Sequence, residues 1–133
     1  MQNHEAWLEI AREDLAAAKG LLDLELFSTT AYHCQQAAEK ALKAYLVFKK
    51  HHVVKSHDLI QLIELSMRFD RDFEKILEAA GVLNPFSTRF RYPSEHDIPD
   101  LSDAKNALSL ARKIFTFVVK KISEPDTGQA DIF

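Results

Sequence analysis

The stretch 31–50, AYHCQQAAEKALKAYLVFKK, constrains the fold most, because it is the longest strongly patterned segment of the chain. Its apolar residues recur every three or four positions: Ala31, Cys34, Ala38, Ala41, Tyr45 and Phe48. This spacing predicts a helix whose apolar stripe organises a helical core. The opposite side is polar and mixed in charge: His33, Gln36, Glu39, Lys40 and Lys43.

Two further segments predict long helices. Asn3 is a candidate N-cap for a first helix of about twenty residues, whose apolar seam is Leu8, Ala11, Leu15, Ala18 and Leu22. After it, Phe27-Ser28-Thr29 gives a short connection with two hydroxyl candidates for the next N-cap. Asp100 or Ser102 can cap the last helix, whose seam is Leu101, Ala104, Leu108, Ala111, Phe115, Val118 and Ile122.

The middle of the chain predicts shorter elements. Ser56 is a candidate N-cap, with Asp58 in the first turn of a third helix. A break at 69–72 separates that helix from a short fourth one, which runs through Ala80 and ends at Gly81. Because no segment alternates at period two, we expect an all-α, up-and-down four-helix bundle with an additional short helix. The bundle spans 1–123, and 124–133 is expected to be a flexible C-terminal tail.

Composition limits the function. The 133 residues suffice for one core, and the net charge of −3 implies that any anion site is local. The single cysteine, Cys34, lies on the apolar stripe and indicates a buried thiol in a reducing compartment. With no signal-like or membrane-spanning run, we expect a cytoplasmic protein without membrane contact. Three scattered glycines exclude a glycine-rich phosphate loop, no zinc-like spacing occurs, and we expect neither metal nor cofactor.

The segment 84–99, NPFSTRFRYPSEHDIP, has no helical period and holds three of the four prolines. A connection of about 15 residues is much longer than the usual 4–6 and is typical of a functional or interface element. It contains Arg89, Arg91 and His96, whose side chains suit phosphate binding and proton transfer. Alternatively, these side chains form surface ion pairs with Glu95 and Asp97.

Three motifs together resemble the HEPN domain (higher eukaryotes and prokaryotes nucleotide-binding). They are CQQAAEKALKAYL in the second helix, SHDL at the third and TRFRYP in the late loop. The resemblance covers residues 5–122 and implies a small helical bundle that pairs with a copy of itself. It also implies a minimal nucleotidyltransferase partner, as in toxin–antitoxin modules, and binding of a nucleotide or RNA.

Some HEPN proteins are metal-independent ribonucleases with an Arg, four to six residues and a His. Arg91 and His96 match this spacing and are the candidate catalytic pair, with Arg89 as the alternative arginine. In the active members a polar residue usually follows the arginine at a helix start, whereas here Tyr92-Pro93 follow Arg91 within a loop. We therefore rank anion binding ahead of ribonuclease activity.

The leading hypothesis is a nucleotide- or RNA-phosphate-binding HEPN domain. Its predicted binding residues come from the second helix and the late loop: Gln36, Glu39, Lys40, Lys43, Arg89 and Tyr92. These two stretches should therefore lie close together, within one subunit or across a dimer. The alternatives are the ribonuclease and a purely structural interaction module, in which the polar helix side is a solvated face held by the Glu39–Lys43 pair.

Overall fold

The computed structural model describes residues 3–93 and 97–124, and all regular elements in these ranges are helical. The elements are α1 (His4–Asp23), α2 (Phe27–Phe48), α3 (Leu59–Met67), the 3₁₀ helix η1 (Arg71–Ile76), α4 (Leu77–Leu83), the 3₁₀ helix η2 (Asn84–Ser87) and α5 (Leu101–Ser123). The predicted all-α helical bundle is confirmed. Of the expected flexible tail, 124–133, residues 125–133 lie outside the described residues.

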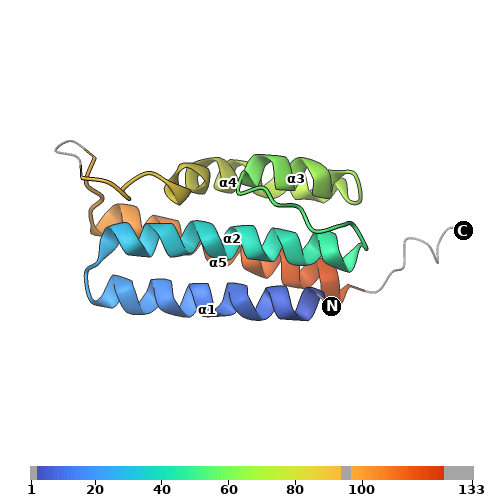
Figure 1. The fold of residues 1–133 in the computed structure, drawn as a ribbon, viewed down its shortest axis with the longest axis horizontal. Helices are drawn as coiled ribbons and strands as arrows, with labels where there is room; N and C mark the ends of the chain where they lie inside the picture. The colour runs from blue at the N-terminus through green and yellow to red at the C-terminus, as the bar shows by residue number, and fades with distance from the viewer. Residues whose placement is uncertain (1–2, 94–96, 125–133) are drawn as a thin grey trace, which may run out of the picture.

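Helix α2 occupies the middle of the bundle (Figure 1). It runs antiparallel to α1, packs along α5, and is covered on its remaining side by α3 and α4. The α1–α2 turn, the segment after η2 and the start of α5 all lie at one end of the molecule (Figure 1). Arg91, in the segment after η2, therefore lies beside the first turns of α2.

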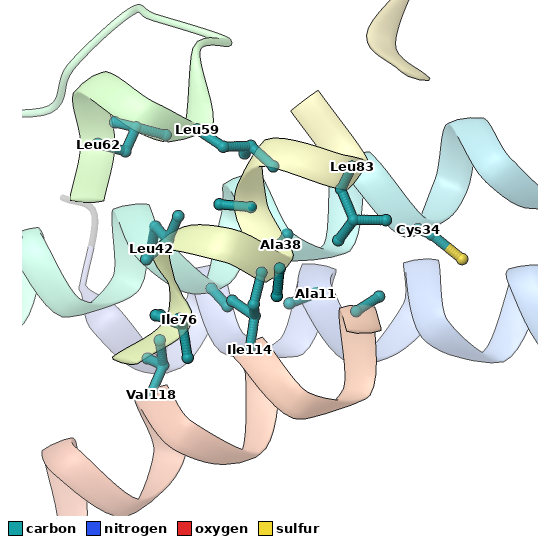
Figure 2. Packing of buried hydrophobic residues seen from close by; sticks show 14 of the residues in the cluster. Ala11, Cys34, Ala38, Leu42, Leu59, Leu62, Ile76, Leu83, Ile114 and Val118 are labelled. Carbon is teal, nitrogen blue, oxygen red and sulfur yellow. The ribbon is translucent and has the colours of Figure 1, made fainter. Parts of the chain in front are cut away.

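The apolar stripe predicted for α2 is buried, with Ala31, Cys34 and Ala38 at most 2% exposed. Figure 2 shows apolar side chains of α2, such as Leu42, in one cluster with those of α3, α4 and α5. Burial also raises the pKa of the Cys34 thiol to about 12, which keeps it protonated and unreactive. Cys34 is thus the small buried residue that its position in the sequence indicates.

An aromatic cluster joins η1 to the two longest helices. Phe73 is fully buried, and its ring centroid lies 4.3 Å from that of Tyr45 on α2 and 5.0 Å from that of Phe117 on α5. These separations are typical of favourable aromatic pairs. Phe73 therefore anchors the middle of the chain to the α2–α5 pair.

Side chains cap three α-helices and the 3₁₀ helix η1, and two of these caps are predicted from the sequence. The Asn3 side chain accepts from the Ala6 N–H, and Asp100 forms a reciprocal capping box with Asp103. For α3 the prediction of Ser56 is wrong, because Asp58 is the N-cap and accepts from the backbone of Ile60 and Gln61. Ser56 Oγ instead accepts from the Asp58 N–H.

Two other predicted helix boundaries are wrong. Neither Ser28 nor Thr29 caps α2, because the helix begins at Phe27 and Leu26 is the N-cap without a side-chain hydrogen bond. Gly81 lies inside α4, which continues to Leu83. Its φ is not positive, so nothing in its backbone requires a helix end there.

Helix α1 ends in a Schellman turn at a residue other than glycine. Leu26 N–H donates to Leu21 C=O and Glu25 N–H to Leu22 C=O, which places Glu25 at φ 61°. This left-handed conformation costs an L-residue with a Cβ about 1–2 kcal/mol.

We expect Glu25→Gly to raise the free energy of unfolding by about 1 kcal/mol, because glycine adopts this conformation without strain. Urea unfolding at neutral pH measures the change. Glu13→Gly is the matched control, since Glu13 is an exposed residue in the interior of α1 and should lose about 1 kcal/mol. A loss of stability in Glu25→Gly would contradict the expectation.

In the part of the chain that the structure describes, no helix combines the length and apolar character needed to cross a membrane.

Candidate functional site

Glu39 is buried in the polar side of α2 with only 1% of its surface exposed. Its Oε2 accepts from Lys43 Nζ at 3.0 Å, and its Oε1 lies 2.9 Å from His57 Nδ1. Because a carboxylate only accepts, His57 donates from Nδ1. Lys43 is 6% exposed, and its Nζ also lies 5.8 Å from the centroid of the Trp7 ring.

The neighbouring polar residues continue this network. Gln35 is fully buried and donates to His57 C=O at 3.0 Å, Gln36 donates to Gln35 Oε1 at 2.7 Å, and Lys40 donates to Gln36 Oε1 at 2.9 Å. The network fastens the connection before α3 onto α2. Glu39 and Lys43 do form the predicted ion pair, but the interpretation of a solvated face is wrong for both residues. Neighbouring segments of the same chain cover them.

Electrostatics favour the ionised form of Glu39. Burial alone raises the pKa of its carboxyl, but hydrogen bonds from His57 and Lys43 and the nearby charge of Lys40 outweigh burial and leave the pKa below its ordinary value. Glu39 and Lys43 therefore neutralise each other inside the protein. Of the residues predicted on this helix, only Gln36 and Lys40 keep part of their surface exposed.

The two candidate arginines have different surroundings. Arg89 donates from Nε and Nη2 to the carboxylate of Asp97 at 2.8–3.0 Å, and hydrogen bonding to Arg89 lowers the Asp97 carboxyl pKa. Its guanidinium also lies 4.5 Å from the Phe90 ring centroid. Arg89 thus forms the surface ion pair with Asp97 that is predicted from the sequence as the alternative. Its Nε and Nη2 donors are already used in that pair.

Arg91 lies against the start of α2. Its guanidinium is 4.2 Å from the Tyr32 ring centroid, and within the described ranges no carboxylate forms an ion pair with it. Between the two arginines, Phe90 has φ 68°, a left-handed conformation that a bulky residue rarely adopts. Such conformations persist where the surrounding structure fixes them, and they concentrate at functional sites.

A cleft of about 300 Å³ lies beside Arg91. It is lined by Ser28, Thr29, Tyr32, His33, Phe90 and Arg91. The first N–H groups of a helix lack intrahelical acceptors, and here no side chain caps them and no acidic residue occupies the first turn. The cleft thus combines a guanidinium, an imidazole, hydroxyls and the positive end of a helix dipole.

His33 is oriented by α1. Its Nδ1 lies 2.9 Å from Asp14 Oδ1, and 29% of the His33 side chain and 16% of the Asp14 side chain are exposed. Since the carboxylate accepts, Nδ1 carries the hydrogen, and Nε2 is the atom that a ligand can reach.

The structure brings only part of the predicted site together. The late loop does reach α2, but at Tyr32 and His33, which lie about 15 Å of helix rise before Lys43. Arg91 belongs to this cleft, whereas Glu39 and Lys43 face Trp7 and His57. Tyr92 is 79% exposed at the surface. His96, the predicted partner of Arg91, lies outside the described residues.

Of the six residues that line the cleft, only Arg91 is among the predicted site residues. The sequence places His33 on the polar side of α2 but gives no indication that Asp14 lies beside it. The two are 19 positions apart, so their pairing depends on the register of two antiparallel helices. The sequence feature that could have indicated this pair is an aspartate on the surface of α1 together with a histidine near the start of the next helix.

These features define a helical bundle with a cleft at one end that is lined by a guanidinium, an imidazole and two hydroxyls. The family model for the HEPN domain matches residues 4–122. The chain belongs to the HEPN family, and the resemblance seen in its motifs is confirmed.

Two solved structures are similar to the chain over most of their length. TT1696 from Thermus thermophilus is 34% identical with a TM-score of 0.79, covering 91% of this chain and 99% of TT1696. ST0689, described as an archaeal HEPN homologue, is 23% identical with a TM-score of 0.77, covering 92% and 100% respectively, and shows the fold. No curated protein matches the chain.

Proposed function

We propose that this HEPN domain binds the phosphate of a nucleotide or of RNA in the cleft beside Arg91. The observation that carries the proposal is the position of Arg91, which borders the cleft next to His33 without a carboxylate partner among the described residues. A guanidinium can hold two phosphate oxygens, and the uncapped start of α2 adds N–H donors. The hydroxyls of Ser28 and Thr29 can donate further hydrogen bonds to the phosphate oxygens.

The proposal includes the partners implied by the family resemblance, a second copy of the chain and a minimal nucleotidyltransferase in a toxin–antitoxin-like module. Glu39 and Lys43 have no part in this binding, because they neutralise each other in the interior. Gln36 and Lys40 keep part of their surface exposed and extend the polar surface one to two turns beyond His33.

RNA cleavage is the second candidate, and the His33–Asp14 hydrogen bond beside Arg91 favours it. A base would take the 2′-hydroxyl proton as that oxygen attacks phosphorus, and an acid would protonate the leaving 5′-oxygen. Arg91 would stabilise the charge on the phosphorane. His33 or His96 would serve as base or acid.

We expect Arg91→Ala to weaken binding of labelled ATP, GTP or a short RNA at least tenfold, because it removes a charge-assisted contact of about 1.5–3 kcal/mol. Fluorescence anisotropy measures the affinity, and gel analysis of the same RNA reports cleavage. Arg68→Ala is the matched control, since Arg68 is an exposed arginine after α3 that does not border the cleft. Absence of binding to the wild-type chain would refute the proposal.

A further inference from the structure

Helix α5 carries an unusual charge distribution for a chain of net charge −3. From Ala104 to Ser123 it has five cationic residues and no aspartate or glutamate. Positions 105, 109, 112, 116 and 120 follow helical spacing and are exposed, so they form one outward face. We define the α5 basic face as Lys105, Ser109, Arg112, Lys113, Thr116 and Lys120.

Neighbouring acidic residues do not neutralise this face. Lys121, which is largely buried, takes the nearby carboxylates of Asp70, Asp72 and Glu124 at 2.7–3.6 Å. Among the described residues, no carboxylate lies within ion-pair distance of Lys105, Arg112, Lys113 or Lys120. The face therefore presents only donors and hydroxyls to a ligand.

Hollows lie on both sides of the face and meet at Arg112. One, of about 290 Å³, is bordered by Lys19 and Leu22 of α1. The other, of about 530 Å³, is bordered by Lys75 and Ile76 of η1 and by Phe117 of α5. The second hollow places an aromatic side chain between cations, the combination with which proteins bind single-stranded nucleic acid.

We propose that the α5 basic face binds the phosphate backbone of single-stranded RNA, with a base in the hollow beside Phe117. Cations recur along the face every seven or eight residues, about 11 Å apart, so one extended strand can contact several of them. Helix α5 also begins at the end of the bundle that holds the cleft (Figure 1). This second surface goes beyond the proposed function, which concerns a single phosphate at Arg91.

The test compares two adjacent, exposed cation pairs on the full chain. Arg112→Glu/Lys113→Glu changes the α5 basic face, and Lys49→Glu/Lys50→Glu at the end of α2 is the matched control. Anisotropy titrations use a labelled 20-nucleotide single-stranded RNA at several salt concentrations. Titration with labelled ATP reports on the cleft separately.

We expect the α5 variant to bind RNA at least tenfold more weakly. The slope of log affinity against log salt should become less negative by about 1.4, because two phosphate contacts are lost. Its affinity for ATP should stay unchanged, whereas Arg91→Ala should lose ATP affinity. Circular dichroism and urea unfolding check folding, and Arg112→Gln/Lys113→Gln should show a smaller loss in the same direction.

Three results would overturn the inference: no RNA binding by the wild type, an equal loss in the α2 control, or equally tight binding of polyglutamate. The last result would assign the face to an acidic protein partner. If ATP still binds in any of these cases, the proposed function stands while the α5 inference fails.

Discussion

Replacing Glu39 by alanine is expected to lower the free energy of unfolding by about 3 kcal/mol, one of the largest effects of a single substitution in this chain. The change leaves the ammonium group of Lys43 buried without its carboxylate partner and removes the acceptor for His57. Breaking a buried ion pair from one side costs about 3–5 kcal/mol, because the remaining charge is desolvated and unpaired. Urea unfolding monitored by circular dichroism measures the difference.

Two variants test that explanation. Glu39→Leu combined with Lys43→Met removes both charges, so it should be more stable than Glu39→Ala alone. Glu9→Ala removes a glutamate with 63% of its side chain exposed, and should change stability by at most about 0.5 kcal/mol. If Glu39→Ala were no less stable than Glu9→Ala, the buried network would not contribute to stability as described.

Replacing Phe73 by alanine is expected to cost about 3–5 kcal/mol, a range typical of phenylalanine truncation in a protein core. Phe73 has no exposed surface and contacts Tyr45 and Phe117 at once, so its loss opens a cavity where η1 meets α2 and α5. Chemical unfolding with fluorescence from the single tryptophan measures the change.

Phe69→Ala is the control for this substitution. Phe69 is 43% exposed and lies just before η1, so its truncation should cost much less than that of Phe73. Phe73→Leu should fall between the two, since it keeps most of the buried apolar volume. Equal losses in Phe69→Ala and Phe73→Ala would show that the cluster does not anchor η1.

The sequence predicted the core of the fold well, because the buried positions of a helix are apolar and recur every three or four residues. The seams of the first, second and last helices coincide with buried or half-buried residues such as Leu8, Ala38 and Val118. Asn3 and Asp100 were found as caps because a short polar residue directly preceded each apolar period. Each of these signals is local, and local signals can be read along a single chain.

The polar residues were harder, because their surroundings depend on segments far away in the sequence. Glu39 and Lys43 have the spacing of a solvent-exposed pair, and nothing near them shows that His57 and Trp7 cover them. The same reason hid the His33–Asp14 pair and left Arg89 and Arg91 indistinguishable. Only the folded chain shows that Arg89 forms an ion pair with Asp97, whereas Arg91 borders the cleft.

The central position of α2 also limits how the domain can exchange information with other molecules. Thirteen of its 22 residues are buried, so the elements around it already enclose most of its surface. Its first turns are an exception, because they border the cleft. A ligand held there would contact a helix that packs on α1, α3, α4 and α5. A shift of α2 at that end would therefore change its packing against all four of these helices directly, with no other element in between.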